Sequence, residues 1–258
     1  MTLLNSVKRI IFGFLVMLIT SALSLAAEID TKLVWHQKTV LSTPVSGVVK
    51  AINVAPGASV NKGDVLLQLD DRAIIENLAK ANADVERARL LEEEAARELD
   101  RTNELYEQTL IADHEKQMAI IAHAEAQAKH QSAKAALAKA QMDMDYSAIR
   151  APYDAIVVKQ YAQVGQTIAN LTAITPLLEV AERGKMAVKV LVSGGTVGKL
   201  KIGNPVKVQT AGRTFNGTIE AVSLEPVSEK SNKYEVKVSF STQGRLLRAG
   251  RSAKVSLP

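Results

Sequence analysis

The chain has 258 residues, of which 47% are hydrophobic, 23% charged and only 4% aromatic. This balance favours several thin modules packed with aliphatic side chains over a single thick core. The net charge of +5 comes from interleaved acidic and basic residues, so nothing indicates binding to nucleic acid. The absence of cysteine excludes disulfides, thiolate metal sites and cysteine nucleophiles.

The N-terminal segment, residues 1–27, has the pattern of a secretory signal. Lys8 and Arg9 precede an uncharged stretch over residues 10–27, which ends in small side chains. A basic start, an apolar run and a small-residue end are typical of a signal peptide. An uncleaved membrane anchor is the alternative, because the stretch approaches the length that spans a bilayer. Either way, the rest of the chain is expected on the far side of the cytoplasmic membrane.

Two segments on either side of residues 72–148 repeat one pattern. A constant offset of 108 residues pairs Pro44 with Pro152, Val49 with Val157, Gly57 with Gly165 and Val60 with Ile168. Each copy predicts two short apolar strands joined by a turn at the glycine, where a positive φ costs little. Two unrelated hairpins with shared proline and glycine are the alternative. Because half a module cannot bury its own apolar face, residues 42–71 and 149–182 are predicted to form one small β-sandwich.

Between the two copies, residues 72–148 change to a helical period. In the first helix, from residue 72 to about 109, apolar residues at seven-residue spacing alternate with small ones placed three residues later. The larger set is Leu78, Val85, Leu99 and Tyr106, interrupted by Glu92; the smaller set is Ala81, Ala88, Ala95, Thr102 and Thr109. Such a seam lets a partner helix approach closely.

The second helix is predicted over residues 114–147, with Asp113 as a candidate N-cap. It is rich in alanine, and its predicted inward stripe is Ile121, Ala124, Ala128, Ala135, Ala138 and Met142. Joined by a short turn, the two helices are expected to form an antiparallel coiled-coil hairpin. A compact helical bundle is the alternative.

After residue 182 the sequence alternates with a period of two. Short alternating segments at 186–192, 205–209, 217–222, 234–240 and 253–257 are separated by glycine and asparagine turns. This spacing predicts a small β-barrel over residues 183–258. A strand within residues 28–41 is expected to close it.

No catalytic, cofactor or metal site is predicted. His123 and His130 lie seven residues apart on one helix, too far for the i,i+4 pair that binds zinc on a helix. They are expected on a solvated polar face, and so is the acidic run Glu92, Glu93 and Glu94. The sequence therefore predicts a non-enzymatic protein.

The order of these modules resembles the HlyD-like membrane fusion proteins, the periplasmic adaptor subunits of tripartite efflux pumps. The resemblance covers residues 30–258. It implies a mixed α and β fold of elongated, multi-module form: a split biotinyl/lipoyl-like β-sandwich, an inserted coiled-coil hairpin and a small β-barrel. Longer members continue into a membrane-proximal domain, of which this chain has no clear counterpart. True lipoyl or biotinyl carriers present a modified lysine at a turn; here Asp70, Asp71 and Arg72 lead straight into the helix, which disfavours a carrier function.

The resemblance also implies partners and a location. These are an inner-membrane transporter, with the resistance-nodulation-division (RND) class favoured over an ABC exporter or type I secretion system, and a TolC-like outer-membrane channel. Self-association into a ring, expected to be hexameric, and a periplasmic location at the inner membrane follow as well.

The predicted hairpin tip carries a further resemblance. Adaptors that dock TolC-like channels share an arginine, a leucine four residues later and a serine seven residues after that. Arg101, Leu105 and Ala112 stand at these spacings, so the resemblance implies a docking site there, without the polar contact of the serine. The alternative is that Arg101 is an ordinary solvated charge and Leu105 widens the helical seam.

Overall fold

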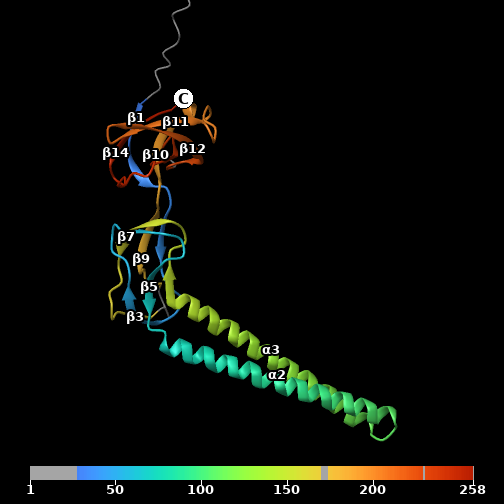
Figure 1. Ribbon diagram of the computed structural model, residues 1–258. Coiled ribbons are helices and arrows are strands. Elements are labelled where there is room, and N and C mark those ends of the chain that lie inside the picture. Colours follow the sequence, from blue (N-terminus) through green and yellow to red (C-terminus); the bar gives the residue numbers. More distant parts are fainter. Residues whose placement is uncertain (1–27, 170–173, 229, 258) are drawn as a thin grey trace, which may run out of the picture. The chain divides into compact units, whose positions relative to one another are not determined.

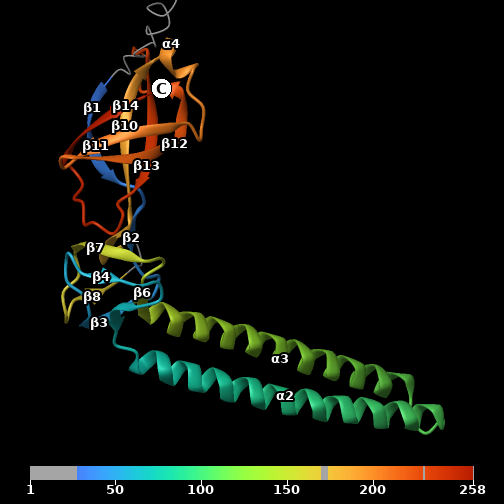
Figure 2. The ribbon, with the colours of Figure 1, turned by 45° about the horizontal axis from the view of Figure 1, so that its top comes forward.

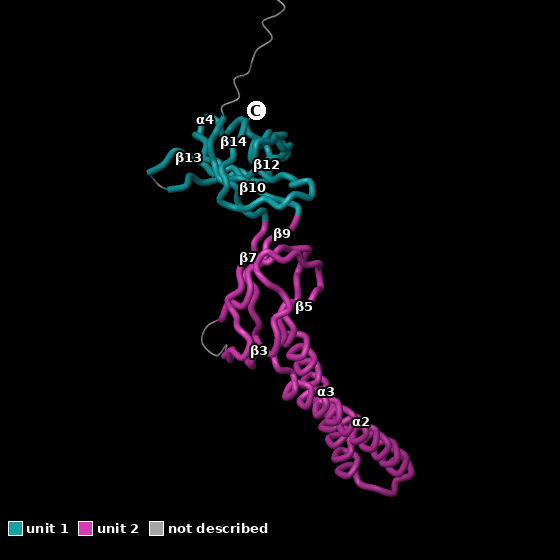
Figure 3. The backbone as a smooth tube through the Cα atoms, turned by 60° about the vertical axis from the view of Figure 1, so that its left-hand side comes forward, with its two compact units in different colours: residues 1–36, 184–258 teal, residues 37–183 magenta. Residues whose placement is uncertain are grey.

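The computed structural model describes residues 28–257 except 170–173 and 229, so the predicted signal segment lies outside the described residues. The chain divides into two compact units, residues 1–36 with 184–258, and residues 37–183 (Figure 3). Within the described ranges, no helix combines the length and the apolar character needed to cross a membrane.

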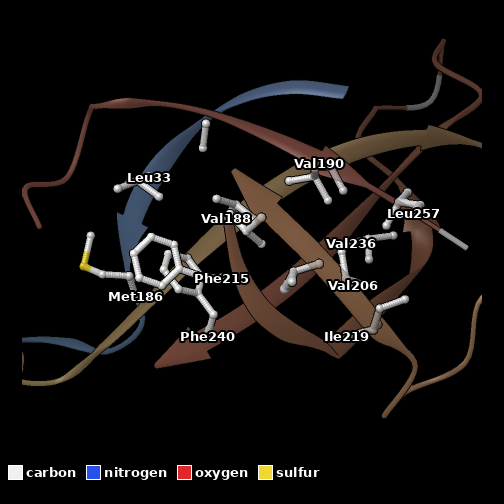
Figure 4. Close-up of a cluster of buried hydrophobic side chains, with 14 of the residues drawn as sticks. Leu33, Met186, Val188, Val190, Val206, Phe215, Ile219, Val236, Phe240 and Leu257 are labelled. Atoms are coloured by element: carbon white, nitrogen blue, oxygen red, sulfur yellow. The ribbon is translucent and has the colours of Figure 1, made fainter. Parts of the chain in front are cut away.

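The described part of the first unit is a closed antiparallel barrel in the order β1-β10-β13-β12-β11-β14, and Figure 2 labels all of these strands. Its elements are β1 (Glu28–Trp35), β10 (Lys185–Ser193), the short helix α4 (Gly194–Val197), β11 (Pro205–Thr210), β12 (Arg213–Pro226), β13 (Lys233–Ser241) and β14 (Ser252–Ser256). Alternate side chains point inward, as the period of two requires. Figure 4 shows this core, in which the rings of Phe215 and Phe240 lie 5.2 Å apart between centroids.

The expected N-terminal barrel strand is shorter than residues 28–41. Strand β1 ends at Trp35, and residues 38–41 form a separate strand, β2 (Lys38–Leu41), which pairs with β9 (Leu178–Glu182) in the second unit. The Thr39 hydroxyl lies 2.9 Å from the Tyr153 hydroxyl and joins β2 to the same unit. The prediction was wrong because apolar and polar residues alternate through both strands, so the sequence does not reveal the break at residues 36 and 37. Before this break β1 pairs with barrel strands, and after it β2 pairs with β9.

The second unit contains a sandwich of two four-stranded sheets among the described residues, in the orders β2-β9-β7-β4 and β6-β5-β3-β8. The remaining strands are β3 (Gly47–Ile52), β4 (Ser59–Val60), β5 (Val65–Leu69), β6 (Ala148–Arg150), β7 (Ala155–Gln160) and β8 (Thr167–Ile168). Strand β3 pairs with β8, β4 with β7 and β5 with β6, so each of these pairs joins a strand before the hairpin to a strand after it.

The two copies also share one hydrophobic core. Val49 and Val60 of the first copy are buried together with Val157 and Ile168 of the second. Strands β7 and β8 have the bounds of β3 and β4 shifted by the 108-residue offset. The structure thus has the interleaved sandwich that the repeat predicts, and the mixed α and β class is confirmed.

Two long helices project from the sandwich and lie side by side in Figures 1 and 2: α2 (Arg72–Glu107) and α3 (Asp113–Ser147). With 36 residues, α2 is about 54 Å long at 1.5 Å per residue. Its buried residues are Ala81, Ala88 and Thr102, all members of the small-residue set that the sequence predicts for the seam.

The inward face of α3 differs from the prediction. All six residues of the predicted stripe are exposed. The residues that face α2 are buried or half-buried at heptad spacing instead: Ala119, His123, Ala126, His130, Ala133, Leu137, Ala140, Met144 and Ser147. The helix carries small or apolar residues on all sides, so periodicity alone does not distinguish one face from another.

Candidate functional site

The far end of the hairpin is a tight turn built by backbone hydrogen bonds. The N–H of Thr109 donates to the carbonyl of Tyr106 at 2.9 Å, and the N–H of Leu110 donates to the carbonyl of Leu105 at 3.0 Å. These two bonds form a Schellman motif, which normally places glycine at the left-handed position. Thr109 occupies it with φ of 62°. A β-branched residue is strained there, and stored strain of this kind concentrates at functional sites.

Of the predicted docking residues, Arg101 carries the charge, and its side chain is exposed. Its guanidinium lies 2.6 Å from the Glu98 carboxylate, and 68% of its side chain is accessible. The hydrogen bond to Glu98 raises the pKa of Arg101, so the group stays cationic. Because it is exposed, it can exchange this ion pair for one with a partner at small cost.

Leu105 lies four residues further along α2, on the same face as Arg101. Its side chain is half-buried, and its carbonyl is the acceptor of the turn. In Schellman motifs this position often makes an apolar contact with the residue that follows the left-handed one, which here is Leu110 with 65% of its surface exposed. An apolar group therefore remains accessible at the turn.

Ala112 lies beyond the turn as the N-cap of α3, so the helix begins one residue earlier than an Asp113 N-cap requires. An alanine side chain accepts no hydrogen bond from the first turn of a helix, whereas a serine would. Asp113 and Glu115 in the first turn offset this through the helix dipole. The departure from serine thus removes a helix cap at this position.

One further contact closes the tip. The ammonium group of Lys116 on α3 lies 4.5 Å from the centre of the Tyr106 ring on α2, within the range of a cation–π interaction. This contact joins the first turn of one helix to the last turn of the other. It was not predicted from the sequence.

The second unpredicted feature lies near the middle of the hairpin. His130 is 7% exposed, and its Nδ1 contacts the carboxylate of Glu92. Its Nε2 is buried and has no hydrogen-bond partner among the described residues. The expectation of a solvated face was therefore wrong for His130, and Glu92 is half-buried, with 23% of its side chain accessible. The available signal was the position of Glu92 within the seam register.

This arrangement offers surfaces for contact with another protein. Among the described residues, no group of three or more histidine, cysteine, aspartate and glutamate side chains could hold a metal ion. The tip instead combines an exposed cation, an accessible apolar patch and a strained turn on a long helical arm.

Residues 37–179, which run from the sandwich through the hairpin and back, match a family model described as CzcB-like, barrel-sandwich hybrid domain. The chain belongs to this family. Its similarity to membrane fusion proteins, inferred above from the residues, is therefore confirmed, and these proteins are adaptors rather than enzymes.

Individual relatives agree with this assignment. Multidrug resistance protein MdtA of Pectobacterium carotovorum is 28% identical over 130 residues, which are 50% of this chain and 32% of MdtA. Macrolide export protein MacA of Yersinia pestis is 30% identical over 131 residues, 48% of this chain and 35% of MacA. The chain thus matches about a third of the length of these curated relatives.

Among solved structures, the membrane fusion protein Spr0693 from Streptococcus pneumoniae R6 superposes with a TM-score of 0.68. The likeness covers 90% of this chain and 98% of that one at 16% sequence identity. At this identity the comparison shows a common fold, and the fold extends over both compact units.

Proposed function

We propose that the chain is a periplasmic adaptor that links an inner-membrane transporter to a TolC-like outer-membrane channel for the export of small toxic compounds. The observation that carries the proposal is the helical arm of the family fold, which ends in a tight turn next to the exposed Arg101 and the half-buried Leu105. The names of two relatives support it, since MacA is named for macrolide export and MdtA for multidrug resistance.

In this role the chain transmits contact and catalyses nothing. The arm would reach the channel with its tip, where Arg101 can bond carboxylates or carbonyls and Leu105 with Leu110 can fill an apolar groove. The sandwich and barrel would hold the arm in place around the transporter. Assembly into a ring, expected to be hexameric, would present several tips to the channel at once, which strengthens weak single contacts.

The test is deletion of the gene, followed by susceptibility measurements with a panel of toxic compounds and complementation by the full chain. The proposal expects increased susceptibility that the full chain reverses and a chain with residues 101–112 replaced by a Gly-Ser turn does not. Unchanged susceptibility across the panel would contradict an export role.

The transporter class is part of the same proposal, with the RND class expected. RND pumps use the proton gradient, whereas ABC exporters use ATP. Export that stops at once when a protonophore is added to cells with maintained ATP supports the RND class. Export that continues under those conditions would assign the chain to an ABC exporter instead.

A further inference from the structure

One of the inner layers of the hairpin pairs a carboxylate on α2 with an imidazole on α3. In an antiparallel pair of helices, the residue numbers of two facing residues add up to a constant value. The residue numbers of Glu92 and His130 add up to the same value as those of Tyr106 and Lys116, so both contacts belong to one register. This register places Val85 opposite Leu137 and Leu78 opposite Met144. The buried alanines Ala81 and Ala88 of α2 and Ala126 of α3 lie between these layers. Glu92 and His130 therefore occupy a layer that apolar side chains fill nearer the sandwich.

The pair is not explained by stability. A carboxylate–imidazole pair withdrawn from water commonly stabilises a protein less than apolar side chains of the same volume, because both groups lose hydration; here 8% of the His130 side chain and 23% of the Glu92 side chain remain accessible. The buried Nε2 of His130 lacks a hydrogen-bond partner among the described residues, which adds a desolvation cost. Polar residues at core positions of coiled coils are known to specify pairing at the expense of stability.

The specification is needed because α3 offers two candidate faces to its partner. The face that packs on α2 contains His123 and His130, whereas the exposed face contains Ile121 and Met142 among its alanines. If only apolar residues are counted, the exposed face of α3 is at least as suitable for packing on α2 as the face that packs there. What the exposed face lacks is a basic partner at the position that faces Glu92.

We propose that the Glu92–His130 pair positions α3 by selecting the face that packs on α2. Glu92 lies in the seam of α2, where 23% of its side chain is accessible, and its carboxylate would face the Ile121 side of α3 without a basic partner. His130 supplies that partner. The energetic difference between the two packings thus comes from the Glu92–His130 layer.

This selection positions the tip. A rotation of α3 to its other face would move Lys116 away from Tyr106 and turn the residues that follow Ala112. Glu92 and His130 therefore act as positioning residues for the docking tip, which is the part of this inference that rests on the proposed function. The packing itself can be tested on the purified full chain without a channel.

The test is disulfide trapping, which the absence of native cysteine makes clean. Ala95→Cys combined with Ala126→Cys reports the observed packing, since Ala126 is buried in the seam. Ala95→Cys combined with Ala128→Cys reports the rotated packing, since Ala128 is exposed. In the otherwise unchanged chain, only the first pair is expected to cross-link.

Glu92→Leu removes the demand for a basic partner while keeping an apolar side chain in the seam, so the helices are expected to remain folded. In this background both cysteine pairs should cross-link. The exchanged pair, Glu92→His with His130→Glu, should restore trapping at Ala126 alone. Exclusive trapping at Ala126 in the Glu92→Leu chain would overturn the proposal. So would trapping at Ala128 in the exchanged chain. A docking failure in cells with normal trapping would instead count against the proposed function.

Discussion

The backbone N–H of Gly57 donates a hydrogen bond of 2.8 Å to the carbonyl of Val157. The equivalent residues of the other copy exchange roles, because the N–H of Gly165 donates to the carbonyl of Val49 at the same distance. The two halves of the sandwich are thus related by an internal two-fold pattern, in which each half completes the turn of the other.

This reciprocity predicts equal effects of substitution at the two glycines. Gly57 and Gly165 have φ of 91° and 84°, and an added Cβ at either position would meet no described atom within 4 Å. Gly57→Ala and Gly165→Ala should each lower the free energy of unfolding by about 1–2 kcal/mol through backbone strain alone. Gly47→Ala is the control, because its Cβ would make an ordinary contact with Leu69 at 3.5 Å. Chemical denaturation measures all three, and a large difference between Gly57→Ala and Gly165→Ala would contradict the symmetry.

The junction between sandwich and hairpin predicts a pH dependence. Arg72 binds both carboxylate oxygens of Asp70 and lowers the pKa of Asp70 from 3.8 to about 2. Lys50 lies 3.0 Å from Asp71 and lowers the pKa of Asp71 as well. Because both folded-state pKa values are depressed, these carboxylates stabilise the junction above pH 3.8, and the contribution is lost as the pH falls towards 2.

Thermal unfolding followed by circular dichroism between neutral pH and pH 2 tests this linkage. The full chain should lose stability over the lower part of that range, and Lys50→Met should show a weaker pH dependence there. An identical pH profile for Lys50→Met would assign the acid sensitivity to other carboxylates.

The strained turn predicts two stabilising substitutions. Thr109→Gly should raise the free energy of unfolding by about 1 kcal/mol, because glycine adopts the left-handed conformation without steric cost. Ala112→Ser should add about 1 kcal/mol by capping α3. Chemical denaturation of the unchanged chain and of each variant measures both changes in the free energy of unfolding. Destabilisation by Thr109→Gly would show that the threonine side chain makes a contact that outweighs its backbone strain.

Much of this fold could be predicted from local patterns. The repeat around Gly57 and Gly165 predicts the interleaved sandwich, since both strand apolarity and turn geometry are encoded locally. The alanines of α2 predict its seam because they contrast with charged neighbours. The face of α3 could not be predicted in the same way, because small residues surround that helix.

The Glu92–His130 pair shows why other features could be recognised only in the three-dimensional structure. Each residue alone is polar and suggests exposure, and only their proximity across the hairpin makes burial acceptable.

At the tip, the spacing of Arg101, Leu105 and Ala112 locates the turn correctly. The Schellman bonds and the Lys116–Tyr106 contact depend on how the chain reverses, which residue spacing does not specify.

The docking proposal predicts a functional difference between two similar arginines of α2. Arg101 and Arg87 are both exposed, and each forms an ion pair with an acidic residue three positions earlier. Arg101→Ala with Leu105→Ser should abolish resistance to exported compounds, whereas Arg87→Ala should preserve it. Loss of an interface hot spot commonly weakens binding roughly tenfold or more. Leu78→Ser in the seam is the stability control, since it should lower the thermal unfolding temperature.

Photo-cross-linking in cells tests the central claim, docking of the tip on an outer-membrane channel, most directly. A photoreactive amino acid at position 101 of the full chain should form a covalent adduct with a TolC-like channel after irradiation, and the same group at position 87 should not. Mass spectrometry identifies the captured protein. An adduct from position 87 alone, or capture from position 101 of proteins other than a channel, would contradict docking through the tip.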